Sequence, residues 1–203
     1  MRGKTGLWIG GGVALLVALF GLYTIGAYNS LVQLDQATQS QWAQVENVYQ
    51  RRADLVPNLV ETVKGASNFE KDTLIAVTEA RAKVGQATAS APQNIANDPA
   101  AFQRFQQAQD GLSSALSRLM VVVERYPDLK ATQNYRDLQS QLEGTENRIA
   151  VERMRFNEAA QAFNTKRQSF PTVVVAGLFG DRFKTKVYFT AQPGAEQAPA
   201  VKF

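Results

Sequence analysis

Residues Leu7 to Ala27 form an uncharged run of 21 residues rich in Leu, Val, Ile and Ala, and no second run of this kind follows it. A helix needs roughly 20 apolar residues to cross a hydrocarbon core about 30 Å thick. Inside lipid, every peptide group must find its hydrogen bond within such a helix. The run therefore predicts a single membrane-spanning helix, and the rest of the chain is expected to work at a membrane surface.

The charges that flank this run predict its orientation. Arg2 and Lys4 precede it, whereas the first charge after it is Asp35. Because positive flanks stay cytoplasmic, we predict a cytoplasmic N-terminus at residues 1–6, a span at residues 7–27 and the remaining chain on the periplasmic or extracellular side. A cleavable signal peptide is the alternative. The retained anchor is favoured because the run exceeds the roughly 7–15 apolar residues of a signal core.

The chain contains no cysteine and no histidine. It therefore lacks disulfides, thiol nucleophiles, the usual ligands of structural zinc and the imidazole of a Ser-His-Asp relay. Di-metal sites in helical bundles couple Glu to His, so Glu143 and Glu146 do not suffice for one. Without Arg2 and Lys4, 20 basic residues face 18 acidic ones, a balance that gives no electrostatic case for nucleic acid. We predict no enzyme, no cofactor or metal, no nucleic-acid partner and no small-molecule substrate.

Beyond the run, the chain divides into long helical patterns. The breaks between them fall near Gly65–Asn68, Ala87–Pro99 and Tyr126–Lys130, and at Pro171. In the third segment, apolar residues recur at alternating three- and four-residue steps, with Gln109 as the one polar member: Phe102, Phe105, Leu112, Leu116, Leu119, Val123 and Tyr126. This spacing is typical of a heptad seam. Asp98-Pro99 supplies a helix start signal and Pro127 a stop.

The other segments carry similar seams. The first shows Leu31, Leu34, Thr38, Trp42, Val45, Tyr49, Arg52, Val56, Leu59 and Val63, the second Leu74, Val77, Arg81 and Val84, and the fourth Leu138, Leu142, Thr145, Ile149, Glu152, Phe156, Ala160, Phe163 and Phe170. Four amphipathic segments predict a bundle. The expected fold is all-α: the membrane helix continues into a long antiparallel four-helix bundle with coiled-coil-like packing over residues 28–170, followed by an irregular tail at residues 171–203.

The tail admits two interpretations. If the helices alternate in direction, the fourth ends facing the membrane, and the tail lies near the bilayer. Basic and aromatic side chains beside an apolar stretch suit a membrane interface; they are Phe179, Arg182, Phe183, Lys184 and Lys186. Alternatively, the tail is strapped over the bundle, with Phe179, Phe183 and Phe189 filling gaps between helices. Residues 191–203 are rich in Ala, Pro and Gln and are expected to be mobile.

A first polar cluster surrounds a proline inside the first helical pattern: Arg51, Arg52, Asp54, Pro57 and Asn58. A proline within a helix removes one backbone hydrogen bond, so it kinks or restarts the helix unless something compensates. In the structural interpretation, Arg pairs with Asp, and Asn58 satisfies the carbonyl that the proline frees. In the functional one, the kinked region is a polar docking point for a partner or another copy.

A second polar cluster lies on the fourth segment: Glu146, Asn147, Arg148 and Glu152. Arg148 and Glu152 are four residues apart and share a helix face, so they could pair. Glu152 also falls on the seam, where an unpaired charge is expensive. The main expectation is an internal ion-pair ladder with Arg52, Arg81 or Arg153 that fixes helix register. The alternatives are an interface with another subunit and a site for an acidic ligand.

Several ordered blocks of sequence combine these features. They include Tyr28-Asn29-x-Leu31-Val32, Tyr49-Gln50-Arg51-Arg52-x-Asp54-Leu55-Val56-Pro57-Asn58-Leu59-Val60, Val77-Thr78-x-Ala80-Arg81-Ala82, Tyr126-Pro127-x-Leu129-Lys130-Ala131, Thr145-Glu146-Asn147-Arg148-Ile149-Ala150, Phe156-Asn157, Phe163-Asn164 and Phe170-Pro171. By these blocks the chain resembles the LemA family across nearly its whole length. The resemblance implies a bacterial envelope protein with one N-terminal membrane helix and a long helical bundle, and it implies no enzyme.

Two functions are compatible with this sequence. In the first, anchored rods associate side by side as homo-oligomers and form a scaffold at the bacterial inner membrane. In the second, the protein is an adaptor that presents its first polar cluster to a membrane protease or another envelope protein. A wide exposed apolar surface would favour self-assembly. A sensor is a more distant third class, because only six residues precede the span.

Overall fold

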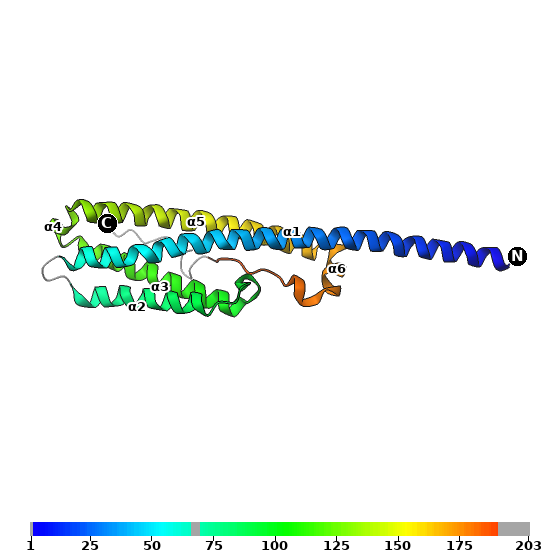
Figure 1. Cartoon of the computed structure of the whole chain (residues 1–203), viewed down its shortest axis with the longest axis horizontal. Coiled ribbons are helices and arrows are strands. Elements are labelled where there is room, and N and C mark those ends of the chain that lie inside the picture. Colours follow the sequence, from blue (N-terminus) through cyan, green and yellow to red (C-terminus); the bar gives the residue numbers. More distant parts are fainter. Residues whose placement is uncertain (1, 66–69, 191–203) are drawn as a thin grey trace, which may run out of the picture.

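The computed structural model describes residues 2–65 and 70–190, with the side chains of residues 8, 10–65 and 70–190. Within these ranges all regular structure is helical, which confirms the all-α prediction. The longest helix, α1 (Arg2–Lys64), contains the apolar run and continues without interruption beyond it (Figure 1). In the described part of the chain, α1 holds the one segment that is long and apolar enough to cross a membrane.

The remaining elements follow the predicted breaks closely. They are α2 (Lys71–Ala89), η1 (Ile95–Asn97), α3 (Pro99–Val123), α4 (Pro127–Lys130), α5 (Gln133–Gln168), α6 (Thr172–Leu178) and η2 (Gly180–Phe183). At the start of α3 the Asp98 carboxylate accepts hydrogen bonds of 3.0 Å from the N–H groups of Ala100 and Ala101, as expected of a capping acid before a proline. Residues 66–68 of the first predicted break lie outside the described residues.

α1 packs mainly against α5, and α2 packs against α3. Residues farther along α1 contact residues that come progressively earlier in α6 and α5. Tyr23 contacts Thr172, Thr38 contacts Ala159 and Arg52 contacts Glu146. The helices α1, α2, α3 and α5 lie lengthwise beside one another, and the N-terminal part of α1 projects beyond them (Figure 1). The α2–α3 pair accompanies only the part of α1 farthest from its N-terminus.

The buried core follows the predicted seams. On α3, seven predicted positions are at most 3% exposed: Phe102, Phe105, Gln109, Leu112, Leu116, Leu119 and Val123. In the middle of the domain, the Trp42 ring lies 5.2 Å from that of Phe105 and 5.5 Å from that of Phe156. Phe170 departs from the prediction, since its side chain is 84% exposed. The reason is that α5 ends at Gln168, so the heptad spacing no longer applies at residue 170.

The end of the domain nearest the apolar run is covered by the tail. Here α6 and η2 pack where α2 and α3 do not reach, and Gly180 adopts a positive φ of 42° at the turn between α6 and η2. The extended segment Lys184–Thr190 then runs back to α3, where Gln106 donates a hydrogen bond of 3.0 Å to the Thr190 carbonyl. Phe183 and Phe189 are buried, as the strapped-tail interpretation expects. The assignment of Phe183 and Lys186 to a membrane interface is therefore wrong, because both side chains are enclosed by protein. The predicted mobile end, residues 191–203, lies outside the described residues.

Candidate functional site

The guanidinium of Arg52 lies at the centre of the domain, 1% exposed, and joins three helices. Its Nη1 donates to the Ser113 hydroxyl at 2.6 Å and to the Glu146 carboxylate at 2.9 Å. Its Nη2 donates to the backbone and side-chain carbonyls of Gln109. The two polar clusters predicted from sequence therefore meet through Arg52 and Glu146, as the ion-pair interpretation expects.

Arg52 is buried because it falls on the seam of α1, at a position where the heptad spacing predicts an apolar residue. The ring of Tyr49, one turn earlier, lies 5.0 Å from the guanidinium carbon, a cation–π distance. Burial raises the pKa of the Tyr49 phenol, and the nearby positive charges of Arg153 and Arg52 oppose that shift without cancelling it. The Glu146 side chain is 40% exposed, so water reaches the acidic end of the network.

The rest of the first cluster differs from its prediction. Asp54 accepts a hydrogen bond of 2.7 Å from Gln50 rather than pairing with an arginine. α1 continues through Pro57, and the carbonyl that this proline frees, that of Ala53, accepts a hydrogen bond of 3.0 Å from Arg81 of α2 rather than from Asn58. The side chains of Arg51, Asp54 and Asn58 are exposed and form a polar stripe on the outer face of α1, and Pro57 is exposed beside them.

The second cluster is also rearranged. Arg148 donates to the backbone carbonyl of Gly144 at 3.3 Å, so it does not pair with Glu152 as predicted. Glu152 instead pairs with Arg155, three residues on, at 2.8 Å. Its side chain is 15% exposed and one of its carboxylate oxygens is buried without a partner. Asn147 is exposed on the surface of α5.

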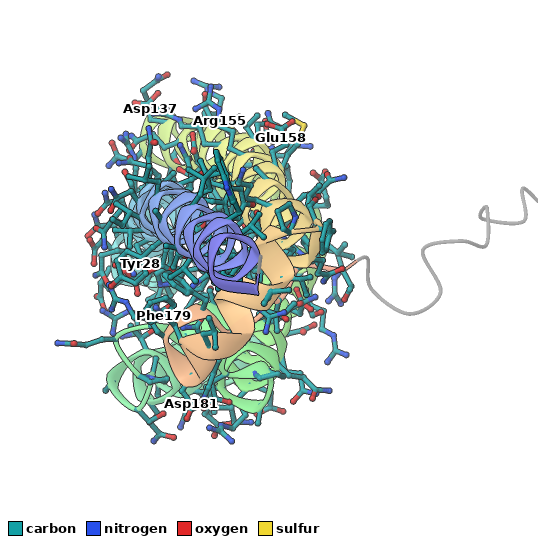
Figure 2. All side chains as sticks on the ribbon, turned by 90° about the vertical axis from the view of Figure 1, so that its right-hand side faces the viewer. Tyr28, Asp137, Arg155, Glu158, Phe179 and Asp181 are labelled. Carbon is teal, nitrogen blue, oxygen red and sulfur yellow. The ribbon has the colours of Figure 1, made fainter. Side chains whose placement is uncertain are left out.

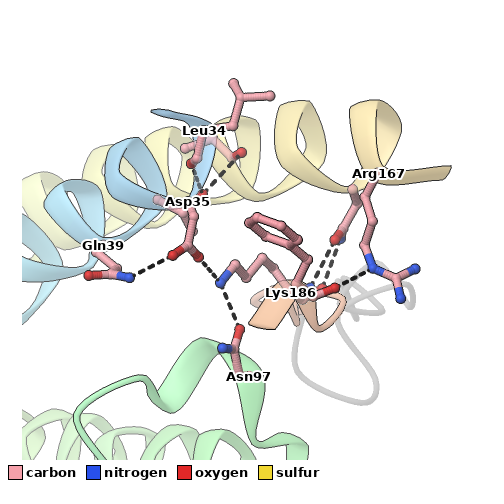
Figure 3. Close-up of polar contacts among 10 residues, drawn as sticks. Leu34, Asp35, Gln39, Asn97, Arg167 and Lys186 are labelled. Atoms are coloured by element: carbon pink, nitrogen blue, oxygen red, sulfur yellow. Dashed lines mark hydrogen bonds and ion pairs between the residues drawn. The ribbon is translucent and has the colours of Figure 1, made fainter. Parts of the chain in front are cut away.

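A third polar network, which the sequence did not reveal, fixes the tail to the helices (Figure 3). The Lys186 ammonium contacts the Asp35 carboxylate of α1 and donates to the Asn97 side chain of η1 at 2.7 Å. Gln39 donates to the second oxygen of Asp35 at 2.9 Å. Lys186 is 2% and Asp35 3% exposed. The Lys186 side chain thus connects the tail to α1 by an ion pair and to the α2–α3 connection by a hydrogen bond.

Two asparagines of α5 hold the extended tail segment alongside this network. Asn164 donates to the Lys186 carbonyl at 2.9 Å and accepts from the Lys186 N–H at 2.8 Å. Asn157 makes the same pair of bonds with Phe189, at 3.0 and 2.9 Å. Each side-chain amide thereby replaces the partner strand that an extended backbone needs. The signal for this arrangement was the repeated Phe-Asn pair seven residues apart, Phe156-Asn157 and Phe163-Asn164.

These networks are suited to joining helices rather than to chemistry. Among residues 8, 10–65 and 70–190, no group of three or more acidic side chains is placed to hold a metal ion. A cavity of about 700 Å³ lies at the end of the domain far from the apolar run, lined by residues that include Thr62, Arg125, Leu129 and Asn134. None of the predicted polar positions lines it.

Comparison with known proteins shows which sequences are similar to this chain. A family model described as the LemA family matches residues 41–203. The magnetosome protein MamQ 2 of Paramagnetospirillum magneticum is 27% identical over 196 residues, which cover 90% of this chain and 71% of the relative. The magnetosome protein MamQ of Magnetospirillum gryphiswaldense is 27% identical over 96% of this chain and 76% of its own length. Protein LemA of Metamycoplasma hominis is 26% identical over 80% of this chain and 69% of its own.

Proposed function

This chain belongs to the LemA family, and from that premise we propose that it is a non-enzymatic, membrane-anchored helical scaffold of the bacterial envelope that self-associates at the membrane. In this proposal residues 7–27 cross the inner membrane once, residues 1–6 are cytoplasmic and the helical domain lies on the periplasmic or extracellular side. The positive residues Arg2 and Lys4 before the run support that orientation.

The observation that carries the proposal is the continuity of α1, which runs from the apolar segment through the whole domain without a break. At about 1.5 Å per residue, the part from Tyr28 to Lys64 extends roughly 55 Å. Because α5 and the tail pack along this part of the helix, anchor and domain form one stiff unit. A stiff rod with a fixed base is suited to organising or shaping a membrane.

The buried polar groups also support a structural role. Arg52 and Lys186, the two most buried cations described, are bound by side chains of the same chain. Neither network opens into the cavity at the far end of the domain. The Nε atom of Arg52 is the one part of its guanidinium without a hydrogen-bond partner. Polar groups held in this way fix the register and the pairing of helices, a role for which buried ion pairs are known.

In this proposal, copies of the protein contact one another through their membrane spans. Most seam positions of the helical domain are buried, and outside residues 170–179 the large apolar side chains exposed on it are dispersed: Ile75, Val121, Val151, Met154 and Tyr188. By contrast, Gly10, Ala14, Ala18 and Gly21 follow one another at helical spacing in α1, and a Cβ added at Gly10 or Gly21 would contact nothing within 4 Å. Small residues of this kind let membrane helices approach closely.

An adaptor is the second candidate. It is favoured by the exposed polar stripe of α1, in which Arg51, Asp54 and Asn58 are unshielded on one helix face in the half of the rod far from the apolar run. An envelope protein such as a membrane protease could bind that stripe. In this alternative the protein acts as a monomer, and its stiffness sets the height at which the stripe is presented above the membrane.

Light scattering coupled to size exclusion of the detergent-extracted full-length protein, at several concentrations, distinguishes these functions. The double variant Ala14→Leu with Ala18→Leu is compared with the control Val13→Leu with Val17→Leu. Discrete assemblies that dissociate in the first variant but persist in the control would support the scaffold and its association through the span. Monomers at every concentration would overturn self-association and favour the adaptor. Assemblies that both double variants retain would support the scaffold but exclude the span as its contact.

A further inference from the structure

The short helix α6 is fixed beside the end of the apolar run. The hydroxyl of Thr172, at its start, lies 2.9 Å from the hydroxyl of Tyr23 in α1. The ring of Phe179, just after its end, packs against Tyr28 with the centroids 4.8 Å apart. Ala27 is buried between these two contacts, although it belongs to the run. α6 therefore lies beside the last turns of the predicted span.

The position of α6 along α1 can be expressed in distance. Tyr23 precedes Ala27 by four residues, which corresponds to about 6 Å along the helix axis. Side chains of a helix also lean toward its N-terminus, so the Tyr23 hydroxyl points farther into the membrane than its backbone. If residues 7–27 fill the hydrocarbon core, Thr172 lies at or below the boundary between hydrocarbon and headgroups. This inference rests on the membrane anchoring that the proposed function assumes.

The outward face of α6 is apolar. Its sequence from Thr172 to Leu178 contains no charged residue. Val175 and Ala176 face the protein and are buried, whereas Val173, Val174 and Leu178 are 42%, 46% and 68% exposed. Phe170, one turn before Val173 and Val174, is 84% exposed. Four large apolar side chains are thus turned away from the protein over two helical turns, at one end of an otherwise polar surface.

We propose that this face of α6 lies in the membrane interface and is the protein's second contact with the lipid bilayer. Viewed from the N-terminal end of α1, as in Figure 2, the segment containing Phe179 lies directly beside the helix. α6 thus belongs to the side of the domain from which the anchor emerges. The proposal retains the interface assignment of Phe179, Arg182 and Lys184, and it transfers the apolar contact from Phe183 to residues 170–178.

The charges around α6 fit a membrane surface that contains anionic lipid. Arg182 and Lys184 follow it and are exposed, and Lys166 and Arg167 precede it on the last turn of α5. Asp181 is the acidic residue among them, and it pairs with Lys184 at 3.3 Å. Basic side chains next to an inserted apolar face bind anionic headgroups.

A second copy of the chain fits this face less well. α6 has seven residues, so it is about 10 Å long. A stable protein interface buries roughly 800 Å² on each partner, which two helical turns do not supply. A bilayer places no such demand, because the anchor already holds the face against it. The additional contact then adds to attachment without a separate binding event.

The absence of cysteine from the chain allows a direct test. Val174→Cys and Leu178→Cys, each labelled with an environment-sensitive fluorophore, would be placed in full-length protein in vesicles of phosphatidylcholine and phosphatidylglycerol at high lipid dilution. Val17→Cys in the anchor and Val121→Cys on α3 are the reference positions, since both side chains are well exposed, at 66% and 70%. Quenching would be compared for a lipid-attached nitroxide and for aqueous iodide.

We expect the lipid-attached nitroxide to quench labels at 174 and 178 at least half as strongly as the label at 17, and iodide to quench only the label at 121. Labels at 174 and 178 that behave like the one at 121 would overturn the proposal. So would labels that are shielded from both quenchers at high protein density and open to iodide on dilution, because a second copy would then cover the face. Loss of quenching at 17 as well would show instead that the anchoring itself is wrong.

Discussion

The Nε atom of Arg81 donates a hydrogen bond of 3.0 Å to the backbone carbonyl of Ala53. This carbonyl would normally bind the N–H of residue 57, but Pro57 has none. A side chain of α2 therefore replaces a backbone donor of α1, and the helix continues to Lys64. The proline, which interrupts the hydrogen bonding of one helix, creates a contact between two.

Arg81→Ala should destabilise the protein by about 1 kcal/mol, because it leaves the Ala53 carbonyl without a donor at a site that water partly reaches. In a Pro57→Ala background the loss should be clearly smaller, since the alanine introduced there supplies the missing backbone N–H. Urea unfolding of the detergent-solubilised chain, followed by circular dichroism, measures both, with Lys83→Ala as the control on α2. Equal losses in the two backgrounds would show that Arg81 acts independently of the proline.

Arg52→Ala should destabilise the domain by about 3 to 5 kcal/mol, because it removes the shared donor of a buried network. Glu146→Gln should cost about 1 kcal/mol, since that carboxylate is 40% exposed and water screens its charge. Glu143→Gln, on the exposed face of the same helix, serves as control. If Glu146→Gln proved as damaging as Arg52→Ala, the ion pair rather than the hydrogen bonds to Gln109 and Ser113 would dominate.

Asp35→Asn and Lys186→Met should each destabilise the protein by about 3 kcal/mol, because each leaves a buried charge without its partner. The double substitution should cost less than the sum of the two. Hydrogen exchange at the N–H of Val187, which donates to Ala96 at 3.0 Å, reports whether the tail has detached. Lys184→Met, at an exposed neighbouring lysine, should leave that exchange unchanged, and additive losses would contradict the pairing.

Stability should fall as the pH rises above about 10, the ordinary pKa of tyrosine. Burial raises the pKa of Tyr49 in the folded protein, so the unfolded chain releases its proton first and is favoured at alkaline pH. Tyr135 adds to this loss, since burial and then Glu124 and Glu143 raise its pKa. Tyr49→Phe should show a weaker loss between neutral and alkaline pH in thermal unfolding. An unchanged pH dependence would assign the effect to other groups.

Leu116→Asp should abolish cooperative unfolding of the helical domain or reduce its stability by more than about 4 kcal/mol, because an unpaired charge would enter the core. The Leu116 side chain is 3% exposed, whereas Val121 on the same helix is 70% exposed. Val121→Asp is therefore the matched control and should change stability little. Cooperative melting of Leu116→Asp at the wild-type temperature would contradict the heptad assignment of α3.

The elements that sequence predicted best are those in which spacing alone decides the outcome. The seam of α3 is buried from Phe102 to Val123, because an apolar stripe with a helical period has one face to bury. Asp98 and Pro99 start this helix as their chemistry requires. The long apolar run also predicted the character of the first part of α1 correctly, since length and composition alone define such a segment.

The pairing of polar residues was predicted less well, because it depends on contacts between distant parts of the chain. Arg52 and Glu146 were both identified, yet Arg81, expected in the ion-pair ladder, donates to the Ala53 carbonyl that was assigned to Asn58. Lys186 was assigned to a lipid surface because its neighbours in sequence are basic and aromatic. Its partner, Asp35, is 151 residues away. A charge that is buried by such a partner cannot be distinguished from a solvated one by local composition.

With residues 7–27 in the bilayer, as we propose, the unbroken course of α1 makes any tilt of the anchor move the whole domain. Transmembrane helices tilt by about 20° on average, and over roughly 55 Å of helix such a tilt displaces the far end sideways by about 19 Å. Small rotations of the anchor are thereby amplified at the tip, in the region of Lys64. Contact between α6 and the lipid would restrict this sideways displacement. The position of the far end of α1 would then depend on a contact at the membrane surface.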